Sequence, residues 1–316
     1  MLSKCFLTYL IGGIFMIPNS MEEIYMDNIN TLEKSNIYFL NSESILSNIK
    51  NICNLYNKEN VSTTQSSKAS FFDTLNRLQG FNIPYKEDEI IIKFNDDDII
   101  NHLVNKKVIE RGDLKDNKHL FKDEEQKNIR DNINKALQLL NVLHPDLTYL
   151  IKQLTGTIIF FKKSSTGGGT TSCALGLIWL NPHKDWTIID YADALYHEFT
   201  HTSIFIDDMV NRMFLDAKAC KDPKAYVTSA ILKFKRPLDS AYHAAGVAVA
   251  LMHFYHMLSN KQKALSFLDP LKITINELMG KKEYLGERGI DTLNGMSDFI
   301  NNLDYENIHL SLKLNN

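Results

Sequence analysis

A histidine, a glutamate and a second histidine stand at a spacing that suits metal chemistry, in the run His197-Glu198-Phe199-Thr200-His201. Residues four apart on a helix lie one turn above each other, with Cβ atoms roughly 5–6 Å apart. Two imidazoles placed in this way can bind one metal ion, and the glutamate between them can move a proton or orient a metal-bound water. The pattern therefore predicts a metal-dependent reaction, with His197 and His201 as ligands and Glu198 as the catalytic residue.

The residues around this motif have the spacing of a helix. The run from 190 to 205 contains no Gly or Pro, and Asp190 and Asp193 fall in its first turn, where the helix dipole favours negative charge. Residues of one expected buried face recur at helical intervals: Ala192, Leu195, Phe199 and Thr202. A short motif also arises by chance, so the alternative is a helix that carries two surface histidines.

A catalytic metal site commonly uses three protein ligands, so the motif needs a partner elsewhere in the chain. One class of metallopeptidase uses a downstream glutamate, but no Glu stands between Glu198 and Glu277. Another class extends the motif through a glycine to a third ligand, and Asp207 falls at that ligand's position. Ile204 stands where the glycine is needed for a sharp turn. A continuing helix would carry Asp207 away from the metal, which makes it the weaker alternative.

His243 is the better candidate for the third metal ligand. Pro237 is suited to begin a helix, and the residues around His243 are small and apolar, which lets two helices approach closely. A histidine on such a face is either a core residue or a ligand, and the incomplete motif favours the ligand. Arg236, directly before Pro237, can pair with a carboxylate near the metal; a surface arginine or a packing salt bridge is the alternative.

The order of the expected elements predicts an α+β fold that is mostly α. We expect an amphipathic helix over residues 123–143, and strands over 157–161 and 175–180, directly before the helix of the motif. The glycine-rich segment 164–172 lacks the Gly-Lys-Ser/Thr of a phosphate loop and leads into a strand, so it is expected to be a hairpin loop. This order predicts a zincin-like metal helix beside a small sheet, with further helices carrying the third ligand.

Composition narrows the class of protein. The chain has 316 residues, of which 44% are hydrophobic, enough to bury a sizeable core. Its net charge of −3, with mixed signs, lacks the electrostatic footprint of a nucleic-acid partner. The four cysteines form no C-x-x-C pair, which predicts free thiols of a reducing compartment and thus a cytoplasmic location.

Three regions are expected along the chain: an apolar N-terminal segment (1–25), a mixed region (26–120) and the HExxH catalytic region (121–316). The apolar run 5–17 has the length of a signal-peptide core and is too short for an ordinary membrane span, so no stable membrane insertion is expected. No A-x-A-like cleavage site follows it. A start codon assigned too early and a buried first helix are therefore alternatives to an export signal.

The strand that ends at residues 179–182, the motif, the pair Arg236-Pro237 and His243 together resemble a bacterial family, the HExxH-motif peptide-modification proteins. These are also described as α-ketoglutarate-dependent (2-oxoglutarate-dependent) HExxH-type peptide β-hydroxylases. The resemblance covers residues 123–303. It implies Fe(II) rather than Zn(II), 2-oxoglutarate and O₂ as co-substrates, and a ribosomally made precursor peptide as the substrate, hydroxylated on a side-chain β-carbon.

On that resemblance, His197, His201 and His243 hold the iron, and Arg236 binds the far carboxylate of 2-oxoglutarate. Non-haem Fe(II) oxygenases usually use two histidines and one carboxylate, so a carboxylate ligand stays an alternative to the third histidine. Two other hypotheses follow from the residues alone. One is a zinc metallopeptidase with Glu198 as general base, and the other is a non-catalytic peptide-binding protein with a vestigial metal site.

Overall fold

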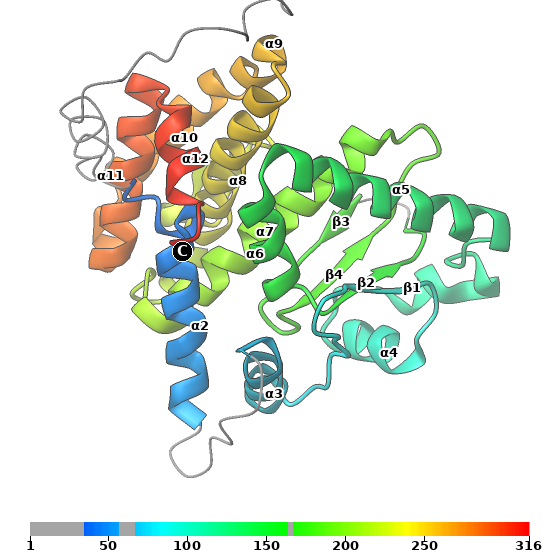
Figure 1. The fold of residues 1–316 in the computed structure, drawn as a ribbon. Coiled ribbons are helices and arrows are strands. Elements are labelled where there is room, and N and C mark those ends of the chain that lie inside the picture. Colours follow the sequence, from blue (N-terminus) through cyan, green and yellow to red (C-terminus); the bar gives the residue numbers. More distant parts are fainter. Residues whose placement is uncertain (1–34, 57–66, 164–166, 316) are drawn as a thin grey trace, which may run out of the picture. The chain divides into compact units, whose positions relative to one another are not determined.

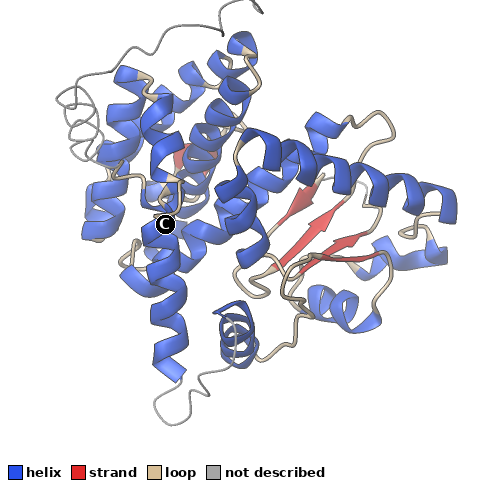
Figure 2. Ribbon diagram, in the orientation of Figure 1, coloured by secondary structure: helices blue, strands red, loops and turns tan. Residues whose placement is uncertain are grey.

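A computed structural model describes residues 35–56, 67–163 and 167–315, and their contacts group them in one compact unit, Ser35–Asn316 (Figure 1). Helices make up 64% of the structure beside a small mixed sheet, which confirms the α+β, mostly α class (Figure 2). Among these residues, no helix has both the length and the apolar character that a membrane crossing needs. The N-terminal segment 1–25, with its signal hypothesis, lies outside them.

A four-stranded sheet has the order β1 (Ile91–Lys93), β2 (Thr157–Phe160), β4 (Leu177–Leu180) and β3 (Gly168–Gly169). The first three strands are parallel and β3 is antiparallel to β4. Every residue of β2 and β4 is buried, as the continuous apolar runs of parallel strands require. The two strands predicted before the motif are confirmed. The sheet also joins β1 to β2, on either side of the region boundary expected near residue 120.

The hairpin loop predicted over residues 164–172 is wrong, because the strands on either side of it, β2 and β4, are parallel and the segment itself contains strand β3. A Cβ atom on Gly168 would come within 2.6 Å of Cδ2 of Leu180, and one on Gly169 within 2.8 Å of Nε1 of Trp179. A side chain at Gly169 would collide with the Trp179 ring, and one at Gly168 would also meet the Trp179 carbonyl oxygen at 3.0 Å, so either would require β3 or β4 to shift. The glycines therefore allow β3 to pack closely against β4. Their number in the sequence suggests a flexible loop instead, because the packing partner is not visible in a local pattern.

The N-terminal half of the chain contains seven of the helical segments in the described residues. They are η1 (Tyr38–Leu40), α2 (Ser42–Tyr56), α3 (Ser67–Gln79), α4 (Asp97–Asn105), η2 (Arg111–Asn117), α5 (Asp123–Leu143) and α6 (Pro145–Leu154). Helix α5 has the predicted bounds and runs across the sheet (Figure 1). Arg130 of α5 donates to the carbonyl oxygen of Ile92 at 3.2 Å and covers the ring of Phe94, so α5 packs on β1.

Two long antiparallel helices, α7 (Ile188–Asn211) and α8 (Leu238–Met257), form the centre of the molecule. Their contacts pair His201 with His243 and Tyr196 with His253, so residue numbers rise along one helix as they fall along the other. A Cβ atom on Gly246 would approach Ile204 Cδ1 to 2.7 Å. The small residues of α8 thus permit the close helix approach that the sequence predicts, and α8 is buried on nearly every side.

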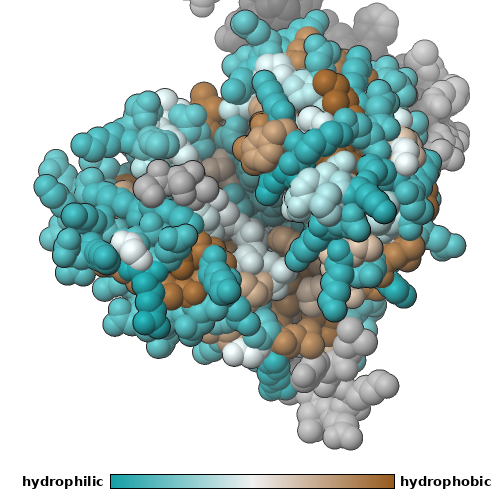
Figure 3. All heavy atoms as spheres, turned by 180° about the vertical axis from the view of Figure 1, so that it is seen from behind, coloured by the Kyte–Doolittle hydropathy of each residue, from teal (hydrophilic) through white to brown (hydrophobic). Residues whose placement is uncertain are grey.

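The remaining elements surround α8. They are η3 (Ala219–Lys221), η4 (Pro223–Ala225), β5 (Val227–Thr228), β6 (Lys235–Arg236), α9 (Lys261–Leu265), α10 (Leu268–Met279), η5 (Lys282–Tyr284), α11 (Glu287–Asn302) and α12 (Tyr305–Ser311). Strands β5 and β6 form a two-stranded antiparallel ladder directly before α8. Helices α9, α10 and α12 pack on α8, as Figure 1 shows. Seen from behind, the molecule is hollowed near its middle, and hydrophilic side chains gather on either side of the hollow (Figure 3).

The cysteines of the described part, Cys53, Cys173 and Cys220, are free. Cys5 lies outside it. The prediction of free thiols is therefore confirmed for three of the four cysteines, and the cytoplasmic location stays a prediction.

Candidate metal centre

The HExxH motif lies in the middle of α7, on a helix longer at both ends than the sequence predicts. Thr187 begins it through a capping box: its backbone N–H donates to Oδ2 of Asp190 at 2.7 Å, and its hydroxyl oxygen accepts from the Asp190 N–H. No Gly or Pro interrupts the helix until Arg212 ends it in a left-handed conformation. The motif histidines therefore stand on an unbroken helix, one turn apart on the same side.

The two motif histidines have the separation that a shared metal ion needs. Nε2 of His197 lies 3.2 Å from Nε2 of His201. Two nitrogens bound to one ion at 2.0–2.1 Å with tetrahedral angles lie about 3.3 Å apart. These two side chains therefore fit a common metal ion without rearrangement.

His243 reaches the same histidines from α8 but contacts a different atom. Its Nδ1 lies 3.1 Å from Nδ1 of His201, while Nε2 of His201 faces His197. His201 thus uses one ring nitrogen for each neighbour, and the three rings do not converge on one point. Within the described residues, no group of three or more His, Cys, Asp or Glu side chains is arranged to hold a metal. His243 as third ligand stays a prediction.

Burial keeps these imidazoles neutral. Desolvation lowers the pKa of His197 to about 4 and of His243 to about 3, and it lowers the pKa of His201 well below its ordinary value. The positive charge of Arg236 adds to the effect at His201 and His243. Neutral imidazole is the form that binds metals. The site is therefore in its metal-binding protonation state at neutral pH.

Glu198 points from α7 towards the edge strand β3. A Cβ atom on Gly168 would lie 3.7 Å from its Oε1. Burial raises the pKa of Glu198 to about 7, partly offset by the nearby Thr170 hydroxyl. Among the described residues, neither Oε2 of Glu198 nor Oγ1 of Thr170 makes a hydrogen bond of normal geometry. A carboxyl group with this pKa can both accept and release a proton near neutral pH.

A cleft of about 650 Å³ contains the motif side chains and Arg236, between β3, α7, α8 and the turn at 231–232. That volume is typical of a small-molecule or peptide site. A larger cavity of about 870 Å³ lies between β1 and α5 and contains none of the predicted site residues. The smaller cleft is therefore the candidate functional site, because it contains the predicted site residues.

Arg236 faces this cleft because it belongs to a short strand. Lys235, its neighbour in β6, points the other way and forms an ion pair with Glu277 at 2.8 Å. Successive side chains of a strand alternate between its two faces, so Arg236 is directed to the cleft. In the part of the chain that the structure describes, no carboxylate lies within 4.0 Å of its guanidinium. Among the described residues, the guanidinium in this cleft therefore has no carboxylate as an ion-pair partner.

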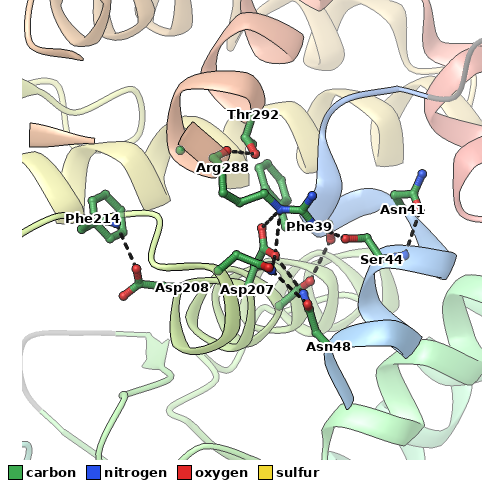
Figure 4. A network of polar contacts seen from close by, with 12 residues as sticks. Phe39, Asn41, Ser44, Asn48, Asp207, Asp208, Phe214, Arg288 and Thr292 are labelled. Atoms are coloured by element: carbon green, nitrogen blue, oxygen red, sulfur yellow. Dashed lines mark hydrogen bonds and ion pairs between the residues drawn. The ribbon is translucent and has the colours of Figure 1, made fainter. Parts of the chain in front are cut away.

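Asp207, the weaker alternative ligand, lies away from the cleft because α7 continues through Ile204 (Figure 4). Its buried carboxylate accepts hydrogen bonds from Arg288 at 3.1 Å and from Asn48 at 2.8 Å. Asn211 donates to the same oxygen at 2.7 Å. Asp207 ties α7 to α2 and α11 rather than contributing to the candidate metal centre.

Asp193, Tyr255 and Lys263 are among the cleft side chains that the sequence did not predict as site residues. The hydroxyl of Tyr255 donates to Oδ2 of Asp193 at 2.6 Å. Asp193 precedes His197 by one helical turn, a spacing that could have drawn attention to it. Nothing in the sequence connects Tyr255 to it, because the contact depends on how α7 and α8 pack.

Comparison with protein-family models finds none that matches this chain, and comparison with curated proteins finds no match either. The resemblance to the HExxH-type family therefore depends on the strand end at 179–182, the motif, Arg236-Pro237 and His243 alone.

Proposed function

We propose that this protein is an Fe(II)- and 2-oxoglutarate-dependent hydroxylase that acts on the β-carbon of a residue in a ribosomally made precursor peptide. The observation that carries the proposal is Arg236, a guanidinium without a described counter-ion in the cleft that contains His197 and His201. Guanidinium binds carboxylates in a bidentate manner, so a small dicarboxylate beside the metal would satisfy it. The resemblance to the HExxH-type peptide hydroxylases supplies the identity of that dicarboxylate.

His197 and His201 would hold the metal through their Nε2 atoms, whose separation suits one ion. Iron in such a site supplies open coordination positions and activates O₂ for insertion of one oxygen atom into a C–H bond. The observed contact of His243 also allows a positioning role. If Nδ1–H of His201 donates to Nδ1 of His243, the lone pair on Nε2 of His201 is free for the metal.

Glu198 would hold or move a proton beside the reacting groups. Its raised pKa, about 7, suits this task near neutral pH. The arrangement of the motif helix next to a small sheet with an antiparallel edge strand supports the zincin-like character that the sequence predicts.

A zinc metallopeptidase is the second candidate, and a specific observation favours it. Glu198 lies under β3, the edge strand of the sheet, where an extended peptide could pair with the outer edge. In that reaction Glu198 would act as general base on water. Imidazole ligands suit both iron and zinc, so the residues alone leave both metals open.

The two activities separate in one experiment. Metal-free protein is loaded anaerobically with Fe(II) or Zn(II) and mixed with a candidate precursor peptide, 2-oxoglutarate and air. The hydroxylase forms succinate and a peptide heavier by one oxygen atom, with Fe(II) only. Peptide cleavage with Zn(II), without consumption of 2-oxoglutarate, would overturn the proposal in favour of the peptidase.

Arg236→Met tests the carboxylate site directly. We expect the KM for 2-oxoglutarate to rise by about tenfold or more, because a charge-assisted bidentate pair is lost. Lys235→Met is the matched control, since Lys235 points to Glu277 on the opposite side of β6. An equal effect of both substitutions would show that Arg236 does not bind the co-substrate.

A further inference from the structure

We infer that Asp193 and Tyr255 form a subsite for a cationic group of the substrate, an ammonium or guanidinium, in the same cleft as the motif histidines. This inference deepens the proposed function, on which its place beside a reactive centre rests. It concerns which residue of a peptide lies next to the modified one. The observations that carry it are the position of Asp193 in the cleft, its burial, and the lack of an ion pair to it among the described residues.

The subsite lies one helical turn from His197. Asp193, His197 and His201 follow each other at four-residue spacing along α7, and all three line the cleft. At 1.5 Å per residue, Asp193 stands about 6 Å along the axis from His197 and about 12 Å from His201. A neighbouring residue of an extended peptide spans about 3.4 Å, so a side chain one to three residues away reaches Asp193.

Arg236 and Tyr255 mark opposite ends of the cleft. Arg236 directly precedes α8, whereas Tyr255 belongs to its last turns. Because α7 and α8 are antiparallel, His201 lies towards the Arg236 end and Asp193 lies against Tyr255. The cleft thus has Arg236 at one end and, at the other, the Asp193 carboxylate with Lys263 near it.

Asp193 is a largely buried carboxylate that forms no ion pair with the described residues, although the charge of Lys263 acts on it from a longer distance. Its Oδ2 accepts from the Tyr255 hydroxyl at 2.6 Å. Over the described ranges, no Lys, Arg or His nitrogen lies within 4.0 Å of it. A buried charge is costly unless it is paired, and the open side of this one is the cleft. Desolvation raises the pKa of Asp193 to about 6, so most of the group is ionised at neutral pH.

The surroundings suit the apolar stem of a lysine or arginine. Trp186 and Tyr255 both line the cleft, and aromatic faces attract a cation and pack on its methylene groups. Lys263 is the one competing cation identified in this cleft beside Arg236. It is exposed and lies over the rings of Tyr255 and Phe267, at 5.6 Å from each, without an ion pair to Asp193.

A purely structural role for Asp193 is the alternative. The capping of α7 falls to Thr187 and Asp190, so Asp193 is not needed there. The hydrogen bond from Tyr255 could still serve only to join α7 to α8. A subsite role predicts that the cleft binds a cationic ligand more tightly than a neutral one, whereas a purely structural role predicts no such preference.

The test uses tryptophan fluorescence of the metal-free protein. The chain has two tryptophans; Trp179 is 6% exposed and Trp186 lines the cleft. The probes are N-acetyl-Ala-Lys-Ala-amide and its norleucine counterpart, which keeps the four-carbon stem of the side chain without the ammonium group. We expect the lysine peptide to bind about five- to tenfold more tightly, and Asp193→Asn to abolish that preference.

Lys263→Met is the second variant and guards against a folding defect in Asp193→Asn. Removal of the competing cation should strengthen binding of the lysine peptide and leave the norleucine peptide unchanged. Lys261→Met, at an exposed position of the same helix, is the control for general charge repulsion and should change neither affinity. Equal binding of both peptides by the wild-type protein would overturn the inference. Because neither metal nor 2-oxoglutarate is present, this result does not depend on whether the protein hydroxylates peptides.

Discussion

At the scale of single residues, His201 is the centre of the candidate site. It contacts His197 through Nε2 and His243 through Nδ1. A histidine that binds a metal through one nitrogen usually donates its other N–H to a partner, which fixes the ring and its tautomer. In a metal-bound protein, the observed contact would let His243 orient the His201 ring without touching the metal.

His243→Ala is expected to lower metal affinity by about ten- to a hundredfold, the usual effect of removing a partner that orients a ligand. His201→Ala should abolish tight binding. Both can be measured by competition with a chromophoric chelator. A loss in His243→Ala as complete as in His201→Ala would instead support direct ligation, as the sequence predicts.

Glu198→Gln is expected to reduce turnover by about 10²–10⁴-fold while metal binding persists, because a proton-handling group is lost. The same substitution should stabilise the metal-free protein at pH 8. The folded-state pKa of Glu198, about 7, exceeds its ordinary value of 4.5, so the carboxyl costs stability increasingly as pH rises through this window, and the cost is constant above it.

The expected gain in the free energy of unfolding at pH 8 is up to about 3 kcal/mol, measured by urea denaturation. It should vanish near pH 4. Glu124→Gln, at an exposed position of α5, is the control and should change neither quantity. If Glu198→Gln is no more stable than the wild-type protein at pH 8, burial of the ionised Glu198 carboxylate does not cost stability.

At the scale of elements, two contacts hold the motif helix and the strand beside it. Asp207 joins the second half of α7 to α2 and α11 through Asn48 and Arg288 (Figure 4). Gly168 lets β3 lie directly on β4 and next to Glu198. Both contacts join segments distant in sequence, and both act on the site through the position of backbone rather than through chemistry.

Arg288→Met is expected to lower the free energy of unfolding by about 3–5 kcal/mol, because it leaves the Asp207 carboxylate buried and without a counter-ion. Lys86→Met removes one partner of an exposed ion pair with Glu89 and should cost under about 1 kcal/mol. Urea unfolding compares them. The charge explanation fails if adding Asp207→Asn to Arg288→Met recovers none of the loss.

Gly168→Ala is expected to displace β3, since the new Cβ would meet the Trp179 carbonyl oxygen at 3.0 Å as well as Leu180. We expect the free energy of unfolding to fall by about 1–3 kcal/mol. We also expect activity to fall, because β3, which lies beside Glu198, would move. Gly112→Ala, where nothing lies within 4 Å, is the control. Unchanged activity in Gly168→Ala would mean that β3 does not shape the site.

At the scale of the whole molecule, a second group of histidines joins α6, α8 and α12 at a distance from the cleft residues. The rings of His144 and His309 lie 4.3 Å apart, and that of His253 lies 5.9 Å from His309. Burial is the main reason that the pKa values of these three histidines are lowered. The nearby charges are mixed: Asp146, Glu306, Lys313 and a further histidine, His256.

The sign of the resulting pH dependence is set by these lowered values. Below the ordinary histidine pKa of 6.5 the unfolded chain binds more protons than the folded one, so stability is full above pH 6.5 and falls as pH drops. His253→Gln should make this fall shallower in a series of thermal melts from pH 8 to pH 5. His183→Gln, at an exposed loop position, should leave the slope unchanged. An unaltered slope in His253→Gln would exclude His253 as a contributor.

The sequence by itself determined several helices and strands of this protein. The bounds of α5, the helix of the motif, the helix after Pro237 and strands β2 and β4 all follow from periodicity and breakers, because these act over a few residues of the chain. The same locality places His197, Glu198 and His201 together, since one helical turn suffices to align them.

Only the tertiary structure decided the rest. The antiparallel packing of α7 and α8 brings His243 to Nδ1 of His201 and Tyr255 to Asp193, over separations of 42 and 62 residues. The glycines of β3 and the direction of Arg236 depend likewise on neighbours from other segments. Such contacts are set by packing and side-chain rotamers across the core, which no local pattern encodes.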